Sequence, residues 1–345
     1  MMRLRTSHSV GALLLLLAAR GAPSAGSPAS GTLSRPRVEG SASGRPREPQ
    51  AEFGRRLSTS GAQLLKLLAG DGVDNDRFGM SVAVSSDAAR VVVGAVYYYY
   101  ADYETTVHGS AYVLDGATGE SLLKLVAGDG TAYDRFGISV AVSSDGARVV
   151  VGNDVDNDQG YNSGSASVFD GATGERLLKL VASDGAAGDR FGFSVAVSSD
   201  GARVVVGSRY DNDQGFNSGS AYVLDGATGE RLLKLVASDG AAGDFFGSSV
   251  AVSSDGARVV VGAYGDGSLS GSVYVLDGAT GERLLKLVAS DGAADDRFGF
   301  SVAVSSDGAR VVVGAHRDDD QFGQFRLRVR ARRGHRREAA EACGE

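Results

Sequence analysis

The sequence predicts an all-β protein, a β-propeller of about five four-stranded antiparallel blades in which the last blade is incomplete. One observation is a repeated text in which Phe-Gly, Ser-Val-Ala-Val, Ser-Ser-Asp and Val-Val-Val-Gly follow one another. Another is the repeat period of 58, 55, 55 and 52 residues, which is in the range of propeller blades. The content of 50 glycines and five prolines also suits short strands and tight turns. The Phe-Gly pairs begin at Phe78, Phe136, Phe191, Phe246 and Phe298.

Each repeat is consistent with four strands, as its third copy illustrates. Residues 191–197 alternate large and small side chains, which indicates a first strand. Residues 203–207 contain an uninterrupted valine run, as expected of a second strand that is covered on both faces. A third strand at 220–224 and a fourth at 230–237 flank a tight Asp-Gly-Ala-Thr-Gly turn. Alternation along the fourth strand predicts that Lys234 points into solvent.

The repeats predict nineteen strands in all. We expect a leading fourth strand at Leu64–Ala69, four copies of the remaining pattern, and a final first and second strand. Ring closure would bring the leading strand to the last blade, where one third strand is then absent.

All variation in repeat length falls in one loop. From each Phe-Gly to the glycine that ends Val-Val-Val-Gly is 16 residues in all five copies, and from the glycine of Gly-Ser to the next Phe-Gly is 27 residues in four. The loop between the second and third strands spans 15, 12, 12 and 9 residues. In an up-and-down blade this loop shares a face with the link from the fourth strand to the next blade, for example residues 183–190. A constant frame with one variable loop is typical of a scaffold that presents binding loops.

The flanks differ from the repeats, which we place at residues 61–316. Residues 1–25 resemble a secretion signal, because Arg3 and Arg5 precede an apolar run at 10–19 that is too short to span a bilayer. Residues 26–60 are rich in Ser, Gly, Pro and Arg and indicate a linker or propeptide without a core of its own. Residues 317–345 form an aberrant basic tail.

Charge and cysteine content exclude several classes of protein. Residues 61–316 carry 18 basic and 33 acidic side chains, so the repeats are anionic and nucleic acid is not an expected partner. The only cysteine is Cys343, which leaves no disulfide framework and no paired thiol metal site.

The Phe-Gly-x-Ser-Val-Ala start and the Val-Val-Val-Gly-Ala ending, repeated over residues 64–315, resemble the FG-GAP repeat family, known from the propellers of integrin alpha subunits. The resemblance implies a β-propeller outside the cell or facing the lumen that acts in adhesion or ligand recognition. The family often has an acidic calcium loop between its first and second strands. This chain has a Ser-Ser-Asp turn there with one carboxylate, which is too few for calcium.

Acidic residues in the variable loops suggest a different metal site. Asp154, Asp156 and Asp158 alternate, so three carboxylates could reach one calcium ion. The matching loop of the next repeat keeps Asp211 and Asp213, which are candidate ligand-binding residues, but has Arg209 in place of the first carboxylate. The alternative interpretation is that all of these are solvated turn residues. No cofactor is required, and calcium is the one ion that the pattern allows.

The longest variable loop carries clustered tyrosines that could form a stacking platform for a sugar or a protein. The alternative is a repeat expansion packed on the neighbouring blade. Catalysis is not expected, because His108 and His316 lie at non-equivalent positions and Ser-Ser-Asp is explained by turn chemistry. The candidate ligand-binding tyrosines are Tyr97, Tyr98, Tyr99, Tyr100 and Tyr103.

The basic tail matches the repeat in another reading frame. Codons can be chosen for Leu327 to Gly344 such that a shift of one base encodes Ser-Ala-Tyr-Val-Leu-Asp-Gly-Ala-Thr-Gly-Glu-Arg-Leu-Leu-Lys-Leu-Val-Ala. We therefore hypothesise that a frameshift overwrites a sixth repeat, which removes Cys343 from any functional argument.

These observations predict a secreted or cell-surface, non-enzymatic propeller that binds an extracellular protein or glycan through acidic and tyrosine-rich loops on one face. It would be a monomer or part of a larger surface assembly, with no transmembrane segment apart from the signal sequence. The alternative is an accessory propeller of an extracellular carbohydrate-active or matrix-degrading enzyme.

Overall fold

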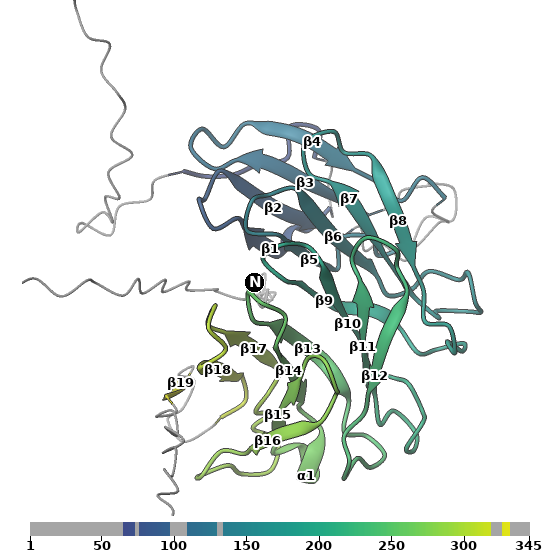
Figure 1. The fold of residues 1–345 in the computed structure, drawn as a ribbon, viewed down its shortest axis with the longest axis vertical. Helices are drawn as coiled ribbons and strands as arrows, with labels where there is room; N and C mark the ends of the chain where they lie inside the picture. The colour runs from purple at the N-terminus through teal and green to yellow at the C-terminus, as the bar shows by residue number, and fades with distance from the viewer. Residues whose placement is uncertain (1–64, 73–75, 97–108, 130–133, 319–325, 332–345) are drawn as a thin grey trace, which may run out of the picture. The chain divides into compact units, whose positions relative to one another are not determined.

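A computed structural model describes residues 65–72, 76–96, 109–129, 134–318 and 326–331. The predicted signal segment at 1–25 and linker at 26–60 lie outside this range. The described residues form five antiparallel sheets and one helical turn, α1 (Asp266–Leu269) (Figure 1). Within them, no helix has the length and apolar character needed to cross a membrane.

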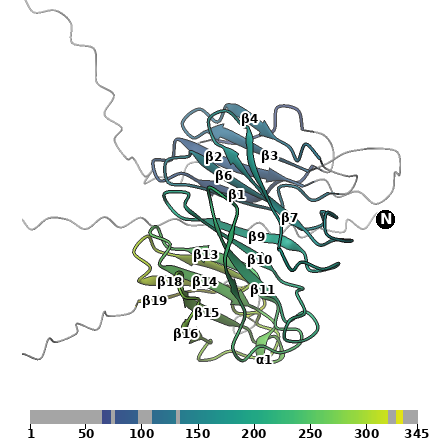
Figure 2. The ribbon, with the colours of Figure 1, turned by 45° about the vertical axis from the view of Figure 1, so that its right-hand side comes forward.

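Each sheet is an up-and-down meander whose strands follow chain order, which is the arrangement of a propeller blade (Figures 1 and 2). Four blades have four strands and the last has three, as the sequence predicts for an incomplete final blade. The strands are β1 (Phe78–Val84), β2 (Arg90–Ala95), β3 (Ser110–Asp115) and β4 (Ser121–Leu125); β5 (Ser139–Val142), β6 (Arg148–Asn153), β7 (Ser165–Asp170) and β8 (Arg176–Leu180); β9 (Phe191–Val197), β10 (Arg203–Ser208), β11 (Ser220–Asp225) and β12 (Arg231–Leu235); β13 (Phe246–Val252), β14 (Arg258–Ala263), β15 (Ser272–Asp277) and β16 (Arg283–Leu287); β17 (Ser301–Val304), β18 (Arg310–Ala315) and β19 (Arg326–Ala331).

The hydrophobic core lies between successive blades. In β6, Val149 and Val151 pack against the first blade, whereas Val150 packs against the third. All three side chains are fully buried. The second strand of the blade is therefore covered on both faces, which is why its sequence is an uninterrupted valine run.

Glycines in the second strands allow the first strand of the next blade to approach closely. A Cβ atom on Gly207 would lie 2.0 Å from the carbonyl oxygen of Gly247, in the Phe-Gly pair of the next blade. The same carbonyl oxygen accepts a 2.9 Å hydrogen bond from the Ser194 hydroxyl. The contact recurs at the other blade junctions with Gly94, Gly152 and Gly262. The repeated glycines and serines of the motif therefore join one blade to the next.

The Ser-Ser-Asp turns confirm the predicted turn chemistry. The Asp200 carboxylate accepts hydrogen bonds from the Ser198 hydroxyl at 2.6 Å and from the Ala202 amide at 3.0 Å. These bonds lower the pKa of Asp200, the serine contributing most. The Ser199 amide donates to the Ser254 carbonyl of the next blade at 3.0 Å, and this link recurs from turn to turn. Each carboxylate is thus used within its own turn.

The predicted alternation of the first strand is wrong at its start. Ser208 of β10 pairs with Phe191, but Gly207 pairs with Ser194, so β9 contains a bulge between these two partners. The bulge breaks the period of two and turns Phe193 away from the core that holds Phe191. Related irregularities occur in β1 and β13.

Both ends of the predicted strand series need correction. Of the expected leading strand at 64–69, the described residues 65–69 form no strand, although Leu67 and Ala69 pack against the first blade. At the other end, the third strand expected to be absent from the last blade is present as β19. Its register places Arg328 opposite Val313, the position that Tyr112 holds opposite Val93 in the first blade. The hypothesis of a frameshift is not tested by this pairing.

Substituting Gly207→Ala tests the close approach between blades. The added Cβ would collide with backbone, which cannot rotate away, so we expect the free energy of unfolding to fall by about 1–3 kcal/mol. Urea unfolding measures this change. Gly128→Ala is the matched control, because a Cβ at Gly128 meets nothing within 4 Å and should cost no stability. Equal stability of the two variants would contradict the account.

Candidate functional site

The variable loops that the structure describes, those of the second, third and fourth blades, share one face with the links between blades, as predicted. In the second blade, the Tyr161 carbonyl accepts a hydrogen bond from the Gly188 amide at 2.8 Å. The carbonyls of Asn162 and Ser163 accept from the amides of Arg190 and Phe191 at 3.1 and 2.9 Å. The loop of one blade is therefore fastened to the link that begins the next.

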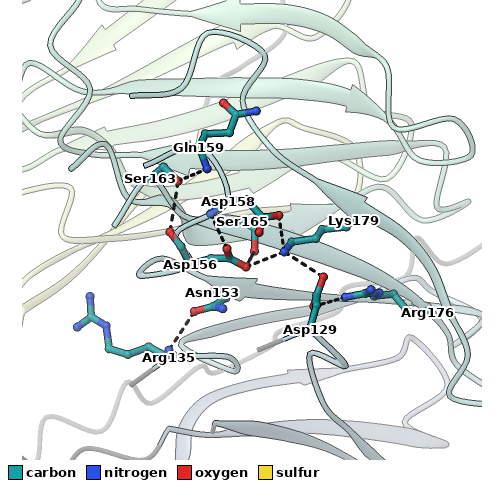
Figure 3. A network of polar contacts seen from close by, with 10 residues as sticks. All are labelled: Asp129, Arg135, Asn153, Asp156, Asp158, Gln159, Ser163, Ser165, Arg176 and Lys179. Atoms are coloured by element: carbon teal, nitrogen blue, oxygen red, sulfur yellow. Dashed lines mark hydrogen bonds and ion pairs between the residues drawn. The ribbon is translucent and has the colours of Figure 1, made fainter. Parts of the chain in front are cut away.

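A lysine ammonium group lies at the centre of the acidic residues on this face (Figure 3). Lys179 Nζ is 2.5 Å from Asp158, 3.0 Å from Asp156 and 3.1 Å from Asp129. Asp156 and Asp158 belong to the variable loop, whereas Asp129 belongs to the link from the preceding blade, where Arg176 also contacts it at 2.6 Å. One cation thus joins a strand, a loop and a link. We call this arrangement the lysine cage.

The cage recurs in the next two blades with similar geometry. Lys234 Nζ is 2.5 Å from Asp213, 3.0 Å from Asp211 and 3.1 Å from Asp184. Lys286 Nζ has two carboxylate partners, Asp266 at 2.5 Å and Asp239 at 3.0 Å. In the first blade, Lys124 is 2.5 Å from Asp71, its one carboxylate partner among the described residues.

The prediction that Lys234 points into solvent is wrong. Its side chain is 16% exposed, because the three carboxylates and the ring of Tyr222 surround it. Burial alone would lower the pKa of Lys234, but hydrogen bonds to Asp213, Asp211 and Asp184 raise it above the ordinary value. The lysine is therefore firmly protonated at neutral pH and acts as a fixed internal cation.

Asp154, Asp156 and Asp158 do not converge on one metal centre. The Asp154 carboxylate is fully buried and pairs with Arg135 and Arg190, whereas the other two surround Lys179. Across the described residues, no group of three acidic, histidine or cysteine side chains is placed to hold a metal ion. The expected three-carboxylate geometry is corrected: an ammonium group and two guanidinium groups occupy the positions around these oxygens.

The other predicted site residues are only partly placed. Asp211 is buried and accepts a 2.9 Å hydrogen bond from the Tyr222 hydroxyl, and its role in ligand binding stays a prediction. Asp213 is half exposed but shares Lys234 with it. The tyrosine cluster at 97–100 and 103 lies outside the described residues, so its role stays a prediction.

Two exposed aromatic side chains were not singled out by sequence reasoning. Tyr161 is 76% exposed and Phe216 is 75% exposed, and they hold equivalent positions in adjacent loops. Each loop is braced internally, since the Asn157 side-chain oxygen accepts from the Asn162 amide at 2.7 Å and Asn212 repeats this bond. The signal was present in the matching Gln-Gly-Tyr-Asn-Ser and Gln-Gly-Phe-Asn-Ser segments.

The arrangement defines a class of protein: a β-propeller scaffold with its variable loops on one face, fixed by internal ion pairs. The chain belongs to the FG-GAP repeat family, whose model matches residues 62–114, 121–169, 176–224, 231–276 and 283–325, more than half of its length.

Solved structures support the fold. Hydrazine synthase from Kuenenia stuttgartiensis is similar at a TM-score of 0.50 and 18% sequence identity, over 76% of this chain. The match covers 64% of that chain, which is less than two thirds of its length, and at this identity it shows the fold alone. No curated protein matches the sequence.

Replacing Lys234 by methionine tests the lysine cage. The variant leaves a buried carboxylate, Asp211, without its cation, so we expect the free energy of unfolding to fall by about 3–5 kcal/mol. The matched control is Lys124→Met, which removes one exposed ion pair and should cost less than about 1 kcal/mol. Urea unfolding of both variants measures the difference. Equal losses would show that the additional carboxylates contribute nothing.

Proposed function

We propose that this protein is a secreted or cell-surface, non-enzymatic scaffold that binds an extracellular protein or glycan through its variable loop face. The observation that carries the proposal is the exposure of Tyr161 and Phe216 at the tips of loops whose backbones are fixed. Large aromatic side chains with few rotatable bonds provide contact area at low entropic cost. Tyr and Phe are also enriched at protein interfaces relative to the rest of the surface.

The lysine cages support a binding role because they pre-organise the face. Lys179 and Lys234 each join their own loop to the link from the preceding blade. A loop that is held in one conformation before binding loses less entropy when it meets a ligand. The constant strands then act as the frame, and the loops that vary in length supply the contacts.

The chemistry of the described residues also favours binding over catalysis. The carboxylates of Asp154, Asp156 and Asp211 are paired with lysine or arginine and are therefore poorly placed for general acid or base work. The extracellular assignment rests on the apolar run at residues 10–19 and on membership of the FG-GAP family.

Substituting Tyr161→Ser and Phe216→Ser together tests the loop face. We expect binding to the ligand identified in a screen of glycans and matrix proteins to weaken about tenfold or more, because two exposed anchors are lost. Stability should be unchanged, since both side chains are in solvent.

The matched control is Leu177→Ser with Leu232→Ser, which removes two half-exposed apolar side chains from the fourth strands. Binding that survives the aromatic substitutions and fails in this control would place the ligand elsewhere. Hydrolysis of a glycan or matrix protein by the isolated chain would overturn the non-enzymatic assignment.

A further inference from the structure

A second set of side chains gathers where the first strands begin and the second strands end. Arg190 precedes Phe191 of β9, and Arg209 follows Ser208, the last residue of β10. Arg297 and His316 hold the corresponding places beside β17 and β18. These positions are on the loop face but at the edge where successive first strands meet, so they are separate from Tyr161 and Phe216.

Arg209 is enclosed by aromatic rings. Its guanidinium carbon lies 3.6 Å from the ring centroid of Phe193 and 4.5 Å from that of Tyr210. The guanidinium of Arg190 lies 5.4 Å from the same Tyr210 ring. Phe193 reaches Arg209 because the bulge in β9 turns it out of the core. Rings that cover the faces of a guanidinium leave its planar edge of N–H donors for recognition.

An unbroken series of aromatic rings connects Arg209 to the last blade. Tyr210 packs edge-on against Phe245 at 5.7 Å, and Phe245 stacks on Tyr264 at 4.9 Å. Phe300 contacts Tyr264 at 5.7 Å and His316 at 4.0 Å. The series crosses three blades, with successive rings packed edge-on, stacked or tilted against one another. We call the rings of Tyr210, Phe245, Tyr264 and Phe300 the aromatic floor.

Tyr264 joins the second arginine to the same series of rings. The guanidinium of Arg297 lies 5.5 Å from the Tyr264 ring. Burial raises the pKa of the Tyr264 hydroxyl, while the positive charges of Arg209 and Arg297 both oppose this rise. Arg297 and Arg209 are therefore connected through the packed rings of Tyr264, Phe245 and Tyr210.

The buried carboxylates in this region bond to groups other than Arg209 and Arg297. Those of Asp189, Asp244 and Asp296 each accept a hydrogen bond from a nearby backbone amide. Asp154 pairs with Arg135 and Arg190. Arg209 and Arg297 have no carboxylate partner within the part of the chain that the structure describes. The Nε atoms of both arginines and Nδ1 of His316 are buried there without a hydrogen-bond partner. Buried donors without acceptors are uncommon and call for an explanation.

We propose that Arg209 and Arg297, over the floor formed by Tyr210, Phe245, Tyr264 and Phe300, bind a small oxyanion, of which phosphate, sulfate and ring-bearing carboxylates share the chemistry. The arginine edges supply donors, and the half-buried rings of Tyr210, Phe245 and Phe300 give an organic anion an apolar surface. The cationic cluster on an otherwise anionic protein attracts such a ligand selectively. This site does not depend on the loop ligand proposed above.

Isothermal titration of the full chain with inorganic phosphate, sulfate, acetate and benzoate tests the proposal. We expect saturable binding with one site per chain, and tighter binding of benzoate than of acetate because of the aromatic floor. Arg209→Gln should raise Kd about tenfold or more, and Arg209→Lys should restore little, because lysine lacks the planar fork. Phosphate or sulfate binding without benzoate binding would assign an inorganic anion to the arginines and contradict the role of the rings.

Arg148→Gln is the matched control, since it removes the same charge beside the Ser-Ser-Asp turns on the opposite face. It should leave Kd unchanged, as should Tyr161→Ser with Phe216→Ser. Arg297→Gln gives an independent variant if Arg209→Gln fails to fold. Saturation by none of the four anions, or equal weakening in Arg148→Gln, would overturn the site.

Discussion

The lysine ammonium group between three carboxylates is the interaction on which the loop face depends. Lys179 and Lys234 come from the fourth strand of a blade, and their partners come from the variable loop of that blade and from the preceding link. One side chain therefore fixes three segments that the chain would otherwise leave as separate loops. In many acidic loops a calcium ion fixes the segments by binding several oxygen atoms at once. Here a lysine side chain of the protein itself contacts the same kind of oxygens, so the folded strands already carry the cation that holds the loops.

The two ends of the blades are held in different ways. At the Ser-Ser-Asp end, hydrogen bonds run from turn to turn, and each aspartate serves its own turn. At the loop end, ion pairs join the segments while aromatic and arginine side chains remain available. Burial, with nearby Asp211, raises the pKa of Asp189 on this face to about 6. The sequence varies at the loop end of the blades, which is held by the repeated lysine–aspartate ion pairs. The loops can therefore differ between blades while the strands stay the same.

The strand order, the turns and the single variable loop could be predicted, because offsets and turn residues are local properties of the repeat. The lysine cage could not be predicted. Lys234 has the place of a solvent-facing residue in the alternation of its strand, and its partner Asp184 is 50 residues earlier in sequence. The bulge in β9 likewise hides the role of Phe193, since the alternation of large and small residues continues through it. β19 was missed because its arginines do not follow a strand pattern, although its backbone pairs with β18.

The most direct test of the internal cation is the stability of the full chain with and without calcium. Urea unfolding should have the same midpoint in a chelator as in calcium, because lysine already occupies the centre of each acidic cluster and a ligand that does not bind the folded state cannot stabilise it. A midpoint that rises with calcium concentration would show that the carboxylates bind the metal in place of lysine, and would contradict the account.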